Sequence, residues 1–153
     1  MAGSFSQIYV QIVFAVKNRQ ALIMPTWEDE LYKYITGIVK GKGQKLQAIN
    51  GVEDHIHFLI RIRPACCLAD LVREIKKAST VFIREQGFSK KKFQWQGGYG
   101  AFSYSYSAVE NVTRYIKNQK EHHSKRSFES EYLRLLEMYH VDYDEEYLFD
   151  WFK

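Results

Sequence analysis

The sequence lacks long polar or repetitive tracts, and its apolar runs extend for only a few residues before a charged residue interrupts them. Without such tracts the chain is not a disordered tail, and without a long apolar run no segment is expected to span a membrane. The first residues, MAGSFSQ, also lack the basic and apolar regions of a signal peptide, so we expect a cytosolic protein. The hydrophobic content of 46% in 153 residues predicts one compact domain over residues 1–153.

Cysteine is nearly absent, since the chain contains only Cys66 and Cys67, which are adjacent. Adjacent cysteines suit neither an ordinary disulfide nor a zinc knuckle. We therefore expect them to be small buried residues without a chemical role.

Charge is distributed unevenly along the chain. Residues 129–153 form an acidic tail with eight acidic side chains against Arg134 and Lys153, a net charge of −6, and because the whole chain carries +4, residues 1–128 carry +10. This basic part is a footprint for a polyanion, although an ordinary solvated surface would show the same excess. An aromatic content of 16%, including eleven tyrosines, favours base stacking and therefore a nucleic acid.

Hydrophobic periodicity and turn residues predict an α+β protein. The expected elements are a strand at 5–16, a helix at 26–39, strands at 45–50 and 53–63, a helix at 67–86, a strand at 102–106, and helices at 107–122 and 127–138. Ser107 and Glu110 have the spacing of a capping box for the first of these last two helices. The order is that of the ferredoxin-like or RRM-like split βαβ fold, with a four- to five-stranded antiparallel sheet, helices on one face and additional C-terminal helices. We expect the other face of the sheet to be open.

The segment EDHIHFLIRIR, residues 53–63, is a strand with two different faces. Its isoleucines and Phe58 form the core face. The other face carries His55, His57, Leu59, Arg61 and Arg63. Side chains two residues apart on a strand are separated by about 6.6 Å, so the two imidazoles can converge on one divalent ion. Asp54 or Glu53 would hold the imidazoles in place, although two exposed or hydrogen-bonded histidines would give the same pattern.

A second group of polar residues occurs in SAVENVTRYIKNQKEHH, the segment that follows the last expected strand. Val109, Val112 and Ile116 form the apolar stripe of a helix. Tyr115 and Gln119 are four residues apart and therefore share a face, so a phenol and an amide can be delivered together. A tyrosine packed at the edge of the helix would satisfy the same spacing.

These two segments resemble a known family. DHIHFLI resembles the His-hydrophobic-His (HUH) motif, and WQGGYGAFSYS followed by YIKNQKEHH resembles the catalytic-helix region of the small single-tyrosine HUH transposases of bacterial insertion sequences and their repeat-associated relatives. The resemblance implies that His55 and His57 bind Mg²⁺ or Mn²⁺, that Gln119 supplies a third ligand, and that Tyr115 is the nucleophile. It also implies a homodimer in which the tyrosine's helix packs against the partner subunit.

The function implied by the resemblance is that of a DNA transposase that recognises hairpin-bearing DNA ends and cleaves single-stranded DNA. A covalent 5′-phosphotyrosine intermediate stores the energy of the broken phosphodiester, so that strands can be rejoined. The candidates for contacts with the nucleic acid are Arg61, Arg63, Arg73, Lys76 and Lys77. A solvated strand end would explain the first two equally well. Neither a small-molecule substrate nor a membrane is expected.

Two other functions stay open on the sequence. A non-catalytic or domesticated nucleic-acid-binding protein on the same fold would explain the basic residues and the aromatic surface, and its binding would be indifferent to EDTA. A zinc hydrolase is a more distant alternative, because no third His, Cys or carboxylate ligand occurs at a zinc motif's spacing.

Overall fold

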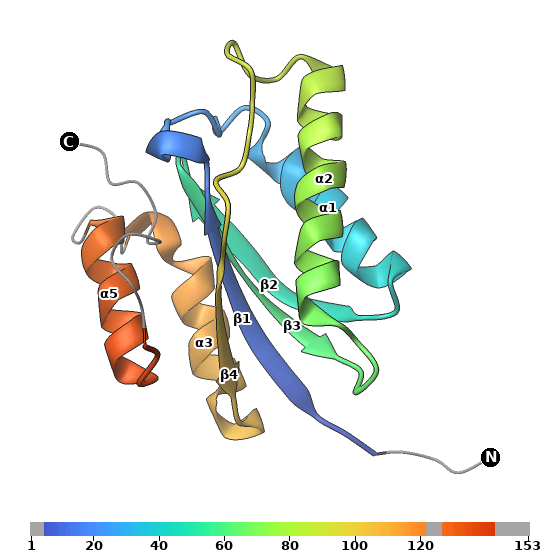
Figure 1. The fold of residues 1–153 in the computed structure, drawn as a ribbon, viewed down its shortest axis with the longest axis vertical. Coiled ribbons are helices and arrows are strands. Elements are labelled where there is room, and N and C mark those ends of the chain that lie inside the picture. Colours follow the sequence, from blue (N-terminus) through green and yellow to red (C-terminus); the bar gives the residue numbers. More distant parts are fainter. Residues whose placement is uncertain (1–4, 122–126, 143–153) are drawn as a thin grey trace.

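A computed structural model describes residues 5–121 and 127–142, and its centre is a four-stranded antiparallel sheet (Figure 1). The strands are β1 (Ile8–Ala15), β2 (Lys45–Val52), β3 (His55–Ile62) and β4 (Gly100–Tyr104). They lie in the order β2-β3-β1-β4, so β1 and β3 pair at the centre. Together with the βαββαβ path of the chain, this order is the split βαβ arrangement, and the predicted fold class is confirmed.

One face of the sheet is covered by α1 (Glu28–Gly41) and α2 (Leu68–Gln86) (Figure 1). The alternating apolar residues of β1 and β3 point into this layer, where Phe14 and Phe58 meet edge to face with ring centroids 5.8 Å apart. The helix α2 ends where Gly87 adopts the left-handed conformation, with a φ of 66°. This layer is the main core, and it has no part in the site described below.

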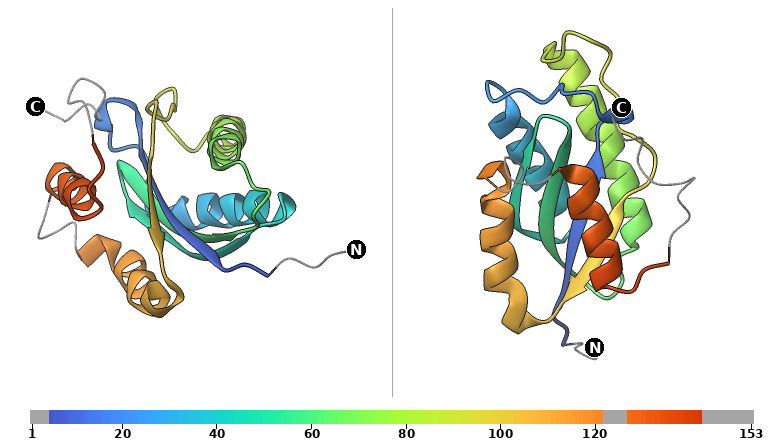
Figure 2. Two further views of the ribbon diagram at one scale, coloured as in Figure 1. Left: turned by 60° about the horizontal axis from the view of Figure 1, so that its bottom comes forward. Right: turned by 90° about the vertical axis from the view of Figure 1, so that its left-hand side faces the viewer.

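The opposite face of the sheet carries α3 (Val109–Lys117) and α5 (Phe128–Met138), as Figure 2 shows. Here Ile116 of α3 packs with Leu59, and Phe128 of α5 packs with Val13. The expectation of an open face is therefore wrong. Both C-terminal helices have an apolar stripe that must be buried, and this face of the sheet provides the surface.

The start of α3 differs from the expected capping box. A short 3-10 helix, η2 (Tyr106–Ala108), precedes α3, and the Ser107 hydroxyl hydrogen-bonds the hydroxyl of Ser105. No side chain caps α3, so the predicted box of Ser107 and Glu110 is wrong. A hydroxyl two residues away competes with the helix N–H groups for the same oxygen.

The end of α3 also differs from the expected continuous helix. The helix stops at Lys117, whose carbonyl accepts a 2.8 Å hydrogen bond from the Asn50 side chain of β2. Asn118 forms a turn, and helical structure is present again at residues 119–121. Tyr115 and Gln119 therefore lie on opposite sides of a break.

Of the remaining expectations, those for two helices are confirmed and that for the cysteines is wrong. The helices expected at 67–86 and 127–138 are confirmed to within one residue at each end. The cysteines are not buried as expected, since Cys67 is exposed and Cys66 is only partly covered. The acidic tail beyond residue 142 lies outside the described residues. Among the helices in the described ranges, none is long and apolar enough to cross a membrane.

Candidate active site

The two histidines of β3 lie side by side beneath the C-terminal helices. Their ring centroids are 5.3 Å apart, and the exposed fractions of His55 and His57 are 1% and 0%. His55 donates from Nδ1 to the Asp54 carboxylate at 2.7 Å, and Arg19 donates twice to the same carboxylate. A carboxylate on one ring nitrogen directs the other toward a metal ion, so His55 is already in the tautomer that a metal requires.

Burial governs the protonation of His55. Burial lowers the pKa of His55 to about 4, although the hydrogen bond with Asp54 opposes this effect. Burial alone would raise the pKa of Asp54, but its hydrogen bond with His55 and the charge and hydrogen bonds of Arg19 lower it. At neutral pH the ring of His55 is therefore neutral and can offer a lone pair from Nε2.

His57 is in the opposite tautomer. Its Nδ1 accepts a 2.8 Å hydrogen bond from the Gln11 amide nitrogen, and its Nε2 donates to Glu131 at 2.8 Å. The Gln11 oxygen in turn accepts from the Tyr104 hydroxyl at 2.8 Å. Metal binding through Nε2 would require the proton on Nδ1, and the amide of Gln11 would have to turn to accept it. The orientation of the Gln11 amide is thus linked to the tautomer of His57.

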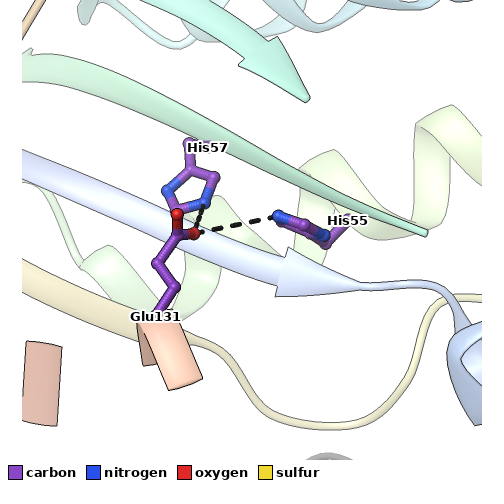
Figure 3. Close-up of side chains that lie close together, drawn as sticks. All are labelled: His55, His57 and Glu131. Atoms are coloured by element: carbon purple, nitrogen blue, oxygen red, sulfur yellow. Dashed lines mark hydrogen bonds and ion pairs between the residues drawn. The ribbon is translucent and has the colours of Figure 1, made fainter. Parts of the chain in front are cut away.

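The third residue at the site is Glu131, from α5 (Figure 3). One carboxylate oxygen lies 2.8 Å from Nε2 of His57 and 3.9 Å from Nε2 of His55, and the three ligand atoms lie within 4.8 Å of one another. Burial alone would raise the pKa of Glu131, but the hydrogen bond from His57, with a smaller contribution from Tyr115, lowers it to about 2. Two imidazoles and an ionised carboxylate form a donor set for a divalent metal ion.

Tyr115 lies beside this cluster, in the same chain. Its half-buried ring is 6.0 Å from the ring of His57, centroid to centroid, and nearly perpendicular to it. Tyr115 also contributes to the lowered pKa of Glu131, so the phenol lies near that carboxylate. The structure therefore brings together three of the predicted residues, His55, His57 and Tyr115, without a partner subunit.

Gln119 is fully buried beyond the turn at Asn118. Among the described residues, neither its amide oxygen nor its amide nitrogen has a hydrogen-bond partner. An unsatisfied buried polar group costs about 1–3 kcal/mol, so an amide left in this state suits a residue that binds a ligand. No described hydrogen bond joins Gln119 to either histidine, and its role as a ligand stays a prediction.

The sequence patterns missed Glu131, which is 74 residues from His57. One signal was present: the buried residues of α5 are Phe128, Glu131, Tyr132, Leu135 and Leu136. The acid thus occupies a position on the apolar stripe of its helix, where a charged residue is buried only if it is paired. Gln11 has no such signal of its own, because its contact with His57 depends on the register that pairs β1 with β3.

Arg61 and Arg63 lie toward the other end of β3 and are exposed. From His57 to Arg61 the strand runs about 13 Å, so these arginines do not contact the cluster. They line a groove of about 400 Å³ with Lys40 and Lys45. Four cations around one groove fit a phosphate backbone that extends away from the histidines.

The three basic residues predicted on α2 lie across the sheet from the histidines. Arg73 pairs with Asp70 at 2.7 Å. The Lys76 ammonium donates to the carbonyls of Gln96 and Gly98 at 2.8 and 2.6 Å and so fastens the segment before β4 to α2. Lys77 is exposed. A direct phosphate contact at the histidine site is therefore not supported for this group.

Known proteins resemble the chain in both sequence and fold. Residues 4–119 match the family model described as IS200-like transposase. The ISDra2 transposase TnpA of Deinococcus radiodurans is 22% identical over 124 residues, which cover 78% of this chain and 89% of that protein. A crystal structure from Deinococcus radiodurans, described as that of a transposase, has a TM-score of 0.64 at 22% identity and covers 78% of this chain and 95% of the other. A REP-associated tyrosine transposase bound to a REP hairpin has a TM-score of 0.55 at 17% identity, covering 77% and 72%.

Proposed function

The chain belongs to the IS200-like transposases, and from that premise we propose that it cleaves and rejoins single-stranded DNA with Tyr115 as the nucleophile. The observation that supports this proposal best is the position of the Tyr115 ring, 6.0 Å from the ring of His57, whose Nε2 donates to the buried Glu131 carboxylate. A residue with only a structural role at the edge of α3 would not need a buried carboxylate and two imidazoles near its ring. The similar transposase bound to a REP hairpin supports a DNA hairpin as the recognised partner.

We propose that His55, His57 and Glu131 bind the divalent ion, Mg²⁺ or Mn²⁺, with the amide of Gln119 as a further ligand. The donor set fits, because its three atoms lie within 4.8 Å of one another and the Gln119 amide has no other partner among the described residues. When bound, such an ion draws charge from the scissile phosphate. In binding it, Glu131 would exchange its hydrogen bond with His57 for the ion.

The chain's own residues prepare the attack. A free phenol has a pKa of about 10 and is a weak nucleophile at neutral pH, so its orientation matters. The Glu131 carboxylate, with a pKa of about 2, is too weak a base to take the phenol proton, and in this proposal it orients the hydroxyl instead. A bond forms between the Tyr115 oxygen and phosphorus, and the bond to the 3′ oxygen breaks. The phenol loses one proton and the departing 3′ oxygen gains one, so the step is balanced.

We also propose that the working enzyme is a homodimer. Excision of a mobile DNA element involves two strand ends, and each protein chain offers one nucleophile. In this proposal each site is built as it is within the single chain, from its own Tyr115 and its own histidines. That differs from the composite site implied by the resemblance. A mass measurement by light scattering on the protein with hairpin DNA checks the stoichiometry, and one chain per complex would overturn the dimer.

The test of the proposed function is formation of a covalent adduct. The full chain is incubated with Mn²⁺ and single-stranded DNA that carries a hairpin beside the candidate cleavage site. The wild type and Tyr106→Phe, a control at an exposed tyrosine, should form the adduct. Tyr115→Phe and EDTA-treated wild type should form none. An equal adduct with Tyr115→Phe would refute the assignment, and hairpin binding without an adduct would support a non-catalytic binding protein.

A further inference from the structure

A second feature of the molecule lies beside the histidine cluster and has no role in the steps above. It is a cleft of about 940 Å³ where the segment after β1, the turn before β3 and the segment after α2 meet. Clefts that take small organic groups measure about 300–1,000 Å³. The first of these segments includes the short 3-10 helix η1 (Lys17–Arg19), and the first and third lie toward the upper end of the molecule in Figure 1.

One wall of the cleft is aromatic. Trp27 and Phe88 are stacked, with ring centroids 5.3 Å apart and an angle of 13° between the rings. Trp27 is almost fully buried, whereas Phe88 is only partly covered and presents apolar surface to the cleft. The buried indole N–H of Trp27 has no partner in the described part of the chain. An aromatic wall of this kind can stack a nucleobase.

Part of the rim of the cleft is cationic. Lys90 and Lys91 line it with exposed ammonium groups, and neither forms an ion pair with a described residue. Glu53 is the one acidic side chain of the lining that is not held by Arg19. The cleft therefore combines an apolar wall with a positive edge, which is the combination that binds single-stranded nucleic acid.

Asp54 connects the cleft to the histidine cluster. Its side chain lines the cleft and also accepts the hydrogen bond from His55. Arg19, which donates to Asp54, sits at a φ of 55° after Asn18 at 58°, two consecutive residues in the left-handed region. Such strained backbone persists where surrounding contacts determine it and is concentrated at functional sites. A strand whose phosphate lies at the histidines thus has this cleft as its immediate neighbour.

We propose that this cleft binds an unpaired base of the single-stranded DNA next to the scissile phosphate. The base stacks on the wall formed by Phe88, and the adjoining phosphate contacts Lys90 and Lys91. Gln20 and Thr26, which are exposed and line the cleft, provide polar groups for the edge of the base. This inference rests on the proposed function, and it makes the cleft the part of the protein that holds the base beside the cut.

The experiment measures binding apart from cleavage. In a Tyr115→Phe background, which cannot form an adduct, Ala21→Trp fills the cleft from its exposed lining. Ala69→Trp makes the same change at an exposed position of α2 outside the cleft. Affinity for a fluorescent twelve-nucleotide oligo-dT should fall with Ala21→Trp by about 5- to 150-fold, the range for one stacked base, and be unchanged with Ala69→Trp.

Two further measurements cover the case in which a bulky residue disturbs folding. An oligonucleotide with one 5-iodouracil should cross-link to the tryptic peptide that contains Phe88. Lys90→Ala with Lys91→Ala should reduce the slope of log affinity against log salt by about 0.7 for each phosphate that these lysines neutralise. The reduction should exceed that of Lys92→Ala, an exposed control that does not line the cleft.

The outcomes separate this inference from the proposed function. Equal affinities for Ala21→Trp and Ala69→Trp, or cross-links only outside the cleft, would overturn the cleft proposal even if the wild type forms its adduct. If the wild type forms no adduct, the proposed function fails. A selective loss of oligo-dT binding with Ala21→Trp would still support the cleft as a site for an unpaired base.

Discussion

For single residues, the positions of protons decide whether the histidine pair can bind a metal ion. His55 donates a hydrogen bond from Nδ1 to Asp54 and presents its unprotonated Nε2. His57 instead has its proton on Nε2 and donates a hydrogen bond to Glu131. Gln11 can serve either state, because its amide offers a donor on one side and an acceptor on the other. If the Gln11 amide turns over, Tyr104 can keep its hydrogen bond with Gln11, since a phenol hydroxyl can donate or accept.

Gln11→Leu should therefore weaken metal binding. The leucine removes the only described partner of Nδ1 of His57, and loss of such a supporting group typically lowers metal affinity by about 10- to 100-fold. Calorimetric titration with Mn²⁺ measures the effect. Gln94→Leu is the control, because Gln94 is exposed and distant in sequence from the site. Equal affinities for the two variants would show that Gln11 does not support His57.

Lys76 gives a prediction for pH. Burial lowers the pKa of its ammonium from 10.5 to about 8. Between these values the unfolded chain binds more protons than the folded one, so the contribution of Lys76 to the free energy of unfolding should rise with pH from about 8 to 10.5.

The measurement compares the free energy of unfolding of the wild type and Lys76→Met at pH 7.5 and 10.5. The difference between them should move in favour of the wild type at the higher pH, whereas Lys77→Met, at an exposed position of the same helix, should show no such trend. A difference that does not change with pH would contradict the lowered pKa.

The sequence shows the histidines and the tyrosine because their signals are local. Strand alternation places His55 and His57 on one face, and helical spacing places Tyr115 beside the apolar stripe. Glu131 has no local signal of that strength, because its role depends on where α5 lands on the sheet. Resemblance to the HUH transposases likewise carries the two motifs and does not extend to this carboxylate.

Among the helices and strands, α5 decides how Glu131 reaches the histidines. It lies across β4 at Gly100, where an added Cβ would come within 2.9 Å of the Tyr132 ring and hydroxyl. Tyr132 is the residue after Glu131. The absence of a side chain at Gly100 thus allows the helix to approach closely enough for the carboxylate to contact His57.

Gly100→Ala should displace α5 and destabilise the protein by about 1–3 kcal/mol, the usual cost of overpacking. Gly97→Ala is the matched control, since nothing lies within 4 Å of its added Cβ, and it should be neutral or stabilising by up to about 1 kcal/mol. Chemical denaturation measures both. An unchanged stability with Gly100→Ala would show that α5 is not held this close to β4.

The end of a helix could be predicted where a residue in the same segment stops it. Gly87 ends α2 as expected, because glycine takes the left-handed conformation without strain. The break after Lys117 was not predictable, because the helical pattern continues through it. At this point the carbonyl of Lys117 accepts a hydrogen bond from the side chain of Asn50, which comes from β2 and is remote in the sequence.

At the scale of the whole molecule, the two faces of the sheet differ in what they contain. The face under α1 and α2 is a core, and the face under α3 and α5 contains the site. The ferredoxin-like path was predictable from the order of elements, whereas the covering of the second face was not. An apolar stripe shows that a helix must be buried, but it does not specify the surface that buries it.

The central claim is that one chain supplies the whole site, and mixing two defective variants tests it most directly. His57→Ala retains the tyrosine, and Tyr115→Phe retains both histidines. On single-stranded DNA with Mn²⁺, wild type should form a covalent adduct that mass spectrometry maps to Tyr115. Each variant alone, and the two mixed and allowed to exchange subunits, should form none. An adduct on the His57→Ala chain in the mixture, or a wild-type adduct at another residue, would contradict the account.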